Sequence, residues 1–287
     1  MRMIVLSAAL LLPFQVAAHP WGATGHMLTA QIAYDNLDVQ TKAEVDRLSQ
    51  VLANYQPRVS NFVPGATWMD MIKGYDLRAF NNWHFIDIPY DPDSIMNVPS
   101  PGGETVIWAI RQATTTLKSK RAGDFQKALM LRFLIHFVGD IHQPLHCIDR
   151  FTQGHPRGDM GGNLFLIEGE KQKKLHAFWD DTANLFPYVD PKSAQAWQSQ
   201  IPQFAKAIEQ EIPPSEVPEW KKVDSDTWAQ ESYQIAKEVA YANIVENKKP
   251  SDTYVQEAQK VIRKRLALGG YRLAALLKAA LGKTPNP

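Results

Sequence analysis

Three histidines and one aspartate lie in a largely apolar stretch, residues 133–147, which reads FLIHFVGDIHQPLHC. His136 and Asp140 are four residues apart, so their side chains would lie on one face of a helix. Pro144 should end that helix, and His146 on the following turn can then fold back toward the same point. Imidazole and carboxylate groups that converge in apolar surroundings are typical of a zinc site. The alternative is a helix whose core histidines are only hydrogen-bonded, which is the commoner role of a single buried histidine.

A second pair of residues has the same spacing, and two further candidate ligands precede the central stretch. His176 and Asp180 lie four residues apart in the segment LHAFWD. Asp70 lies among apolar residues, and His84 is enclosed by aromatic ones. Because a carboxylate is rarely buried without a partner, Asp70 is also expected to face a group of opposite charge.

Helices must position most of these side chains. Hydrophobic periodicity predicts helices at residues 27–37, 39–52, 104–120, 124–143, 194–211, 228–245 and 252–281. Residues 81–89 are predicted to be extended, and residues 161–167 to form a strand of a small β-hairpin with a turn at 168–172. The sequence contains no internal repeat, low-complexity tract or evident domain boundary. We therefore expect an all-α fold in a single compact multi-helix domain with one small hairpin.

The first 18 residues have the features of a secretory signal peptide. Arg2 supplies a positive charge, residues 3–12 are apolar, and Val16 and Ala18 are small residues at the two positions that signal peptidase reads. We expect export, to a periplasm or out of the cell, with the functional domain at residues 21–281. The rest of the chain has no apolar run of membrane-spanning length.

The chain beyond this leader is electrically neutral. Arg2 is the only charged residue of the leader, so the mature chain carries 30 basic and 30 acidic side chains. A neutral chain has no overall attraction to nucleic acid or to an anionic membrane. An anionic substrate must therefore be held locally, and bound metal cations would do this. The single cysteine, Cys147, excludes an internal disulfide.

Several segments together resemble one known family. In chain order they are Trp21-Gly22-x-x-Gly25-His26, Trp68-Met69-Asp70, Trp83-His84-Phe85-Ile86, the block from His136 to His146, Gly161-Gly162-Asn163 and the segment from His176 to Asp180. This order is similar to that of the zinc-dependent, single-strand-preferring class I nucleases, the S1/P1 nuclease family. The similarity covers nearly the whole mature chain.

The resemblance implies an all-α fold with three zinc ions in one cleft. Carried over by position, the ligands of the first zinc would be Asp70, His84, His136 and Asp140. Those of the second would be His146, His176 and Asp180. Those of the third would be His26, Asp140 and the backbone amine and carbonyl of an N-terminal Trp21. His142 is two residues from Asp140, so it would face elsewhere on the helix; we expect it either to have a structural role or to support a ligand from outside the cluster.

The resemblance also implies an activity. The expected reaction is hydrolysis of RNA and single-stranded DNA to 5′-phosphate products, together with 3′-nucleotidase activity. The partners would be single-stranded nucleic acid and 3′-nucleotides, with no membrane and no obligate protein partner. Asp70, Lys73 and Asp140 are the expected catalytic residues; Lys73 would also neutralise phosphate charge, and Asn163 is a candidate substrate contact. Three aromatic residues are candidates for stacking on an unpaired base: Phe80, Trp83 and Phe151.

Two other functions remain open at the level of sequence. The first is a zinc-dependent phospholipase C, a related all-α enzyme with a similar site. The short spacing of Trp21 and His26, and Asp180 rather than Glu as the last ligand, favour the nuclease. The second is a non-enzymatic exported zinc-binding protein. Such a protein would be expected to carry a mobile tract rich in His and acidic residues, and the sequence has none.

The N-terminus differs from the family pattern in one respect. A third zinc of the family type needs the free α-amine of Trp21, whereas the best peptidase site lies after Ala18. We therefore expect further trimming to residue 20, which would remove His19 and Pro20. The alternative is that His19 itself supplies a nitrogen ligand.

Overall fold

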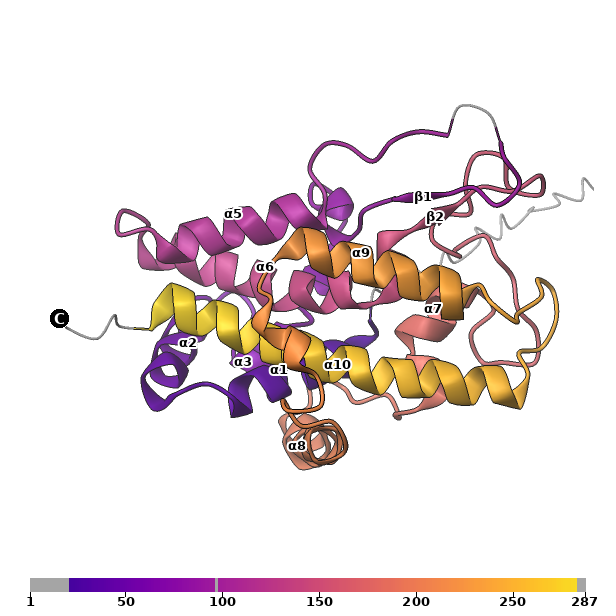
Figure 1. Ribbon diagram of the computed structural model, residues 1–287. Coiled ribbons are helices and arrows are strands. Elements are labelled where there is room, and N and C mark those ends of the chain that lie inside the picture. Colours follow the sequence, from indigo (N-terminus) through magenta and orange to yellow (C-terminus); the bar gives the residue numbers. More distant parts are fainter. Residues whose placement is uncertain (1–20, 96–97, 283–287) are drawn as a thin grey trace, which may run out of the picture.

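The computed structural model describes residues 21–95 and 98–282, and the regular secondary structure of this part is almost entirely helical (Figure 1). The α-helices of this part are α1 (Ala23–Asp35), α2 (Val39–Val51), α3 (Phe62–Gly65), α4 (Trp68–Lys73), α5 (Val106–Lys118), α6 (Asp124–His142), α7 (Leu175–Asp180), α8 (Ala194–Glu211), α9 (Ser225–Ile235) and α10 (Asp252–Leu281). The expected all-α fold is confirmed. The predicted signal peptide lies outside the described residues.

Short turns and one very small sheet connect the helices. The 3-10 turns are η1 (Pro57–Val59), η2 (Asn81–His84), η3 (Pro144–Cys147), η4 (Thr182–Asn184) and η5 (Pro218–Lys221), and a π-helical turn, η6 (Ala236–Ala240), continues α9. Strands β1 (Pro89–Tyr90) and β2 (Asp149–Arg150) pair in parallel, with Pro89 opposite Asp149. Among the described helices, none is long and apolar enough to cross a membrane.

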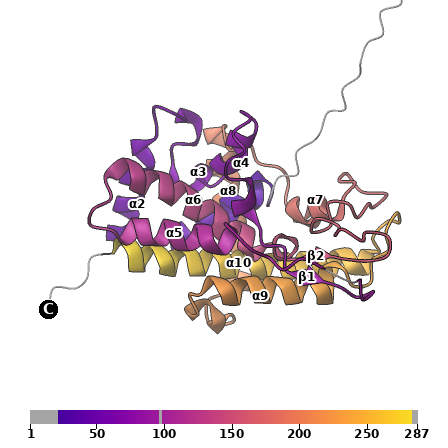
Figure 2. The same ribbon diagram turned by 90° about the horizontal axis from the view of Figure 1, so that it is seen from above.

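Helix α6 lies at the centre of the bundle and contacts α1, α2, α5, α9 and α10. Figures 1 and 2 show α5 alongside α6, and α10 running the length of the molecule. Every residue of α6 from Leu131 to His142 is buried. A helix that is buried on all sides is a core helix, so polar side chains on α6 face other protein groups rather than solvent. As predicted, α6 ends before Pro144, which begins η3.

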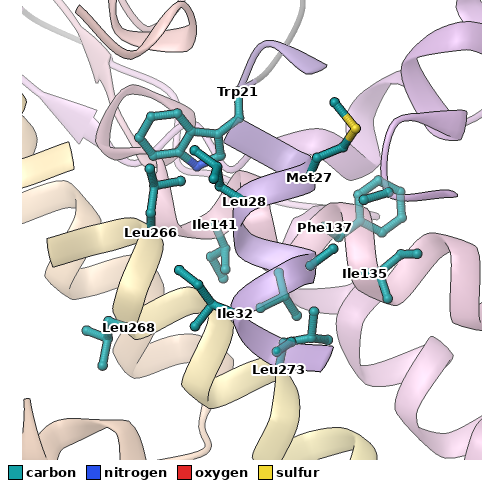
Figure 3. Close-up of a cluster of buried hydrophobic side chains, with 14 of the residues drawn as sticks. Trp21, Met27, Leu28, Ile32, Ile135, Phe137, Ile141, Leu266, Leu268 and Leu273 are labelled. Carbon is teal, nitrogen blue, oxygen red and sulfur yellow. The ribbon is translucent and has the colours of Figure 1, made fainter. Parts of the chain in front are cut away.

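Hydrophobic side chains of α1, α6 and α10 pack together in the core. Figure 3 shows side chains from these three helices packed together: Met27, Leu28 and Ile32 of α1, Ile135, Phe137 and Ile141 of α6, and Leu266, Leu268 and Leu273 of α10. Burial of one such side chain contributes roughly 1.5–3 kcal/mol. Their packing therefore fixes how the three helices meet, and it does so independently of any ligand.

Two local predictions differ from the structure. The predicted hairpin is reduced to a single antiparallel bridge between Leu166 and Lys174. Met160, Gly161 and Gly162 have φ angles of 56°, 60° and 80°, which turn the chain where the strand was expected to begin. The segment predicted to be extended begins with the 3-10 turn η2, because Phe80 and Trp83 pack against Phe133 of α6.

Candidate metal centre

The eight side chains predicted to be metal ligands are all buried and lie together at one end of the core. They form three sets, and within each set one ligand atom per residue lies within 4.8 Å of the others: His26, Asp70 and His136; His84, His136 and Asp140; and His146, His176 and Asp180. The first two sets share His136, and the third shares no residue with them. The ligands come from α1, α4, η2, α6, η3 and α7. Side chains from six separate segments of the chain thus converge.

Asp140 is the centre of the first group. Its Oδ1 lies 3.3 Å from Nε2 of His26. Its Oδ2 lies 2.9 Å from Nδ1 of His84 and 3.3 Å from Nε2 of His136. One carboxylate therefore faces three imidazoles, with its two oxygens directed to different neighbours. This is the arrangement that a carboxylate shared by two cations requires.

Asp70, on α4, also faces imidazoles of the first group. Its oxygens lie 3.8 Å from Nε2 of His136 and 4.0 Å from Nε2 of His26. Lys73, one turn further along α4, places Nζ 3.0 Å from Oδ1 of Asp70. An ammonium group is therefore held beside the cluster, where it could interact with an anionic substrate.

Asp180 is the centre of the second group. Its Oδ1 lies 3.7 Å from Nε2 of His146, and its Oδ2 lies 3.4 Å from Nε2 of His176. Gln143 donates a hydrogen bond from Nε2 to Oδ1 of Asp180 over 2.6 Å. Gln143 was not predicted as a site residue. The only feature of the sequence that pointed to Gln143 was its position inside the central block, directly before Pro144.

Backbone carbonyls orient three of the histidines. Nδ1 of His136 lies 2.6 Å from the carbonyl oxygen of Ala66, Nδ1 of His146 lies 2.7 Å from that of His84, and Nδ1 of His176 lies 2.7 Å from that of Gly161. A carbonyl oxygen only accepts hydrogen bonds, so each Nδ1 carries the proton. The lone pair is then on Nε2, which faces the carboxylates. Histidines that bind metals are held in this way.

Several buried atoms of the cluster make no hydrogen bond. They are Nε2 of His84, Nε2 of His146, Oδ1 of Asp140 and Oδ2 of Asp180. A buried polar atom without a hydrogen bond costs roughly 1–3 kcal/mol. A cation among these nitrogen and oxygen atoms would compensate for this cost, and His nitrogen with carboxylate oxygen is a donor set that suits zinc. The residues present therefore fit a bound metal.

The protonation states also suit metal binding. Burial tends to raise the pKa of the Asp140 carboxyl, but His136 and the other imidazoles outweigh it and hold that pKa well below its usual value. Burial lowers the pKa of His84 to about 3 and lowers the pKa of His26 as well. For His136, the carboxylates of Asp140 and Asp70 outweigh burial and raise the pKa. Neutral imidazoles and an ionised carboxylate are the forms that bind metals. The lowered pKa values of His26, His84 and Asp140 favour these forms, whereas the raised pKa values of His136 and His146 mean that a metal there competes with a proton.

The start of the described chain packs directly against α6. The ring of Trp21 is fully buried, and its Nε1 donates a hydrogen bond to the carbonyl oxygen of Gly139 over 2.8 Å. A Cβ atom on Gly139 would lie 2.7 Å from Nδ1 of His26. Glycine is therefore required here for α1 to approach α6 closely enough for His26 to reach Asp140.

His142 belongs to none of the three sets of candidate ligands. Its Nδ1 bonds the carbonyl oxygen of Val138 over 2.8 Å, and Nη1 of Arg272 donates to its Nε2 over 3.0 Å. Its ring also packs against Trp228. The side chain therefore joins α6 to α10 and α9.

The predicted substrate contacts differ in their surroundings. Asn163 is half-buried, and its Nδ2 donates to the carbonyl oxygen of Met160 over 3.0 Å. Phe151 is buried, and Phe80 and Trp83 pack against Phe133 in the core. The three aromatic residues proposed for base stacking therefore have structural partners, and the prediction of a stacking role receives no support from their positions.

Comparison with known proteins decides the family. A sequence model described as S1/P1 Nuclease matches residues 21–282. The chain belongs to the S1/P1 nuclease family. This nuclease is 28% identical over 294 residues to Endonuclease 3 of Arabidopsis thaliana, which covers 96% of the chain and 94% of that protein. It is 27% identical over 299 residues to Nuclease S1 of Aspergillus oryzae, with 96% of each chain covered. It is 25% identical over 277 residues to Nuclease P1 of Penicillium citrinum, which covers 88% of the chain and 95% of that protein.

The match resolves the alternatives that the sequence left open. This nuclease is a hydrolase that acts on phosphodiester bonds, and nucleic acid is its class of substrate. The comparisons support neither a phospholipase C nor a non-enzymatic binding protein. Its buried His and Asp groups fit the metal dependence of the family.

Proposed function

We propose that the protein is an exported, zinc-dependent endonuclease that cleaves RNA and single-stranded DNA to 5′-phosphate products and also dephosphorylates 3′-nucleotides. The observation that carries the proposal is the position of Asp140, whose carboxylate faces three imidazoles. The second group of ligands, around Asp180, lies on η3, which directly follows α6, and on α7. It adjoins the first group, because Nδ1 of His146 lies 2.7 Å from the carbonyl oxygen of His84. Two adjacent groups of this composition suit a multinuclear site.

The proposed ligand sets follow the family order. Asp70, His84, His136 and Asp140 would hold one zinc, and His146, His176 and Asp180 a second. His26, Asp140 and the backbone of Trp21 would hold a third. The proximity of His26 to Asp140, at 3.3 Å, supports the sharing of this carboxylate. Zinc bound there would activate a water molecule near neutral pH and stabilise negative charge on phosphoryl oxygens.

The chain's own residues would bind and orient the substrate. Lys73 is held beside Asp70 by a 3.0 Å contact, so its ammonium group can neutralise phosphate charge at the edge of the cluster. Asn163 lies on the loop that leads to His176, with an amide that can bond a polar group of the substrate. A preference for single strands would follow if an unpaired base stacks beside the cluster.

One experiment tests the proposal most directly. Zinc is quantified per chain in the exported protein, and the ends of the products from a single-stranded oligonucleotide are analysed. Three zinc ions and 5′-phosphate ends are expected, with little cleavage of a duplex and no hydrolysis of phosphatidylcholine. Products that carry 3′-phosphates, or full activity in a metal-free preparation, would overturn the proposal.

A further inference from the structure

The loop before α7 supports a proposed ligand of the second metal group. Nδ1 of His176 donates to the carbonyl oxygen of Gly161 over 2.7 Å, and its backbone N–H donates to that of Gly162 over 3.2 Å. The direction of the Gly161 carbonyl therefore determines which nitrogen of His176 is free and where it points.

This loop has a backbone conformation that needs support from outside. Met160, Gly161 and Gly162 have consecutive positive φ angles of 56°, 60° and 80°. Left-handed backbone is unfavourable for a residue such as methionine, by about 1–2 kcal/mol. A side chain at Gly161 would also collide with the carbonyl oxygen of Leu145, which belongs to the same turn as His146. The loop thus packs directly on η3, and other contacts must hold it there.

Asp159 provides these contacts from a fully buried position. Its Oδ1 accepts hydrogen bonds from the backbone N–H of Gly162 over 2.9 Å and from the hydroxyl of Tyr241 over 2.8 Å. The backbone N–H of Arg150 also donates to Oδ1 over 3.3 Å, and Nε of Arg150 lies 3.4 Å from Oδ2. The carbonyl oxygen of Asp159 accepts from the N–H of Leu164 over 2.9 Å. Asp159, which precedes Gly161, is therefore bonded to Gly162 and Leu164, which follow it, and these bonds close the loop around Gly161.

Arg150 and Tyr241 hold the Asp159 carboxylate in place. The guanidinium of Arg150 lies 4.6 Å from the centre of the Tyr241 ring and 4.9 Å from that of Phe165. Burial, and next the charge of Asp159, raise the pKa of Tyr241 well above its usual value, so its hydroxyl remains a donor. A charge buried without partners would be very costly. Here the charge is paired with Arg150 and also bonded to the loop.

We propose that Asp159 is a positioning residue for the second metal group. It holds the loop so that the carbonyl of Gly161 meets Nδ1 of His176 and leaves Nε2 directed at Asp180. This inference rests on the proposed function, because it takes His176 to be a zinc ligand. A purely structural anchor would affect the folding of the whole domain, whereas a positioning residue affects zinc at one group.

The test compares Asp159→Asn with the milder Tyr241→Phe, which removes only the hydroxyl that bonds Asp159. The matched control is Tyr271→Phe, because the Tyr271 hydroxyl donates to the carbonyl oxygen of Ile212 over 2.9 Å, away from the loop. Each exported protein is dialysed against increasing chelator, and the zinc retained per chain is measured. Circular dichroism and thermal unfolding are recorded on the metal-stripped forms.

We expect Asp159→Asn to lose one zinc per chain at roughly 10-fold lower chelator concentration than the unaltered protein. Tyr241→Phe should shift in the same direction by a smaller factor, and Tyr271→Phe should not shift. Added zinc should restore nuclease activity to both loop variants. Retention of all zinc by both variants would overturn the inference, as would loss of every zinc in parallel with a lower melting temperature of the metal-free form. If the unaltered protein binds no zinc, the proposed function itself fails, and this outcome is visible before any variant is made.

Discussion

Gln143 and Asp180 are 37 residues apart and are joined by a 2.6 Å hydrogen bond from the amide Nε2 to the carboxylate Oδ1. The other end of the amide accepts a hydrogen bond from the N–H of Leu145, also over 2.6 Å. One side chain at the end of α6 thus orients both the turn that carries His146 and the carboxylate that faces it.

Replacing Gln143 with leucine should weaken the second metal group. The variant keeps a side chain of similar size but cannot donate to Asp180, so we expect zinc affinity at that group to fall about 10–100-fold. The measurement is zinc competition together with kcat/KM at limiting zinc. Gln203→Leu on α8 is the matched control, because the Gln203 amide donates only to a backbone carbonyl at the exposed surface. Equal zinc affinity in both variants would contradict the role of Gln143.

Asp140→Asn and His142→Ala should affect different properties: the first should lower activity, and the second should lower stability. Loss of the shared negative charge should lower kcat/KM by at least about 100-fold while the helix packing remains. His142→Ala removes the partner of Arg272 in the core, so it should lower the melting temperature but change kcat/KM of the folded protein only a few-fold. Kinetics below the melting temperature of both variants, with unfolding followed in parallel, separate the two effects. Similar losses of activity would show that His142 acts in the site.

His142 should also make stability depend on pH. Burial, and then the charges of Arg265 and Arg272, lower the pKa of His142 well below its usual value of 6.5. The folded state therefore keeps the imidazole neutral, while the unfolded chain binds a proton below about pH 6.5. Stability from this residue is present above that pH and is lost as the pH falls, at up to about 1.4 kcal/mol per pH unit. In His142→Gln this contribution should vanish, and urea unfolding of metal-free protein between pH 6.5 and 5 measures the difference in slope. If the free energy of unfolding changed with pH equally in the two proteins, His142 would make no contribution to the pH dependence.

Removal of metal should abolish hydrolysis and destabilise the fold together. Without a cation, Asp140 and Asp180 retain buried oxygens that make no hydrogen bond. Zinc that binds the folded state alone stabilises it by about 2.7 kcal/mol at a concentration 100 times its Kd. The melting temperature should therefore fall after chelation and rise again with added zinc. A melting temperature independent of zinc would argue against ligation by the buried cluster.

The N-terminal residue should control the third zinc. A protein that begins at Trp21 offers an amine, whereas one that retains His19-Pro20 offers an amide, whose lone pair is delocalised. We expect the longer form to bind one zinc weakly and to be less active. Intact mass of the exported protein establishes its first residue, and zinc content and activity of both forms test the consequence. A fully active form that begins at His19 and holds three zinc ions would refute the requirement, and would favour His19 as a ligand.

The helices could be predicted because their signals are local. The complete set of proposed ligands came only from the family resemblance, because the convergence of six segments has no local signal. The spacing of His136 and Asp140 needs only the period of a helix, and α8 and α10 have the predicted bounds. Contacts between distant segments have no such signal. The bond from Gln143 to Asp180 depends on how α7 packs, and Asp159 looks like a solvated loop residue until Tyr241, 82 residues away, is placed against it. The 3-10 turn at Asn81–His84 likewise places Trp83 against Phe133, a contact between distant segments that the turn's own sequence does not reveal.

Gly139 of α6 has no side chain, and a methyl group there would lie only 2.7 Å from Nδ1 of His26 on α1. A survey of all single substitutions, scored by activity, should therefore show this position to be as intolerant of substitution as the proposed ligands His136 and Asp140. The helices could separate to admit a methyl group only by moving His26 away from Asp140. Such a survey would therefore group Gly139 with the residues proposed to act in catalysis, although its own role is only to leave space for the ring of His26.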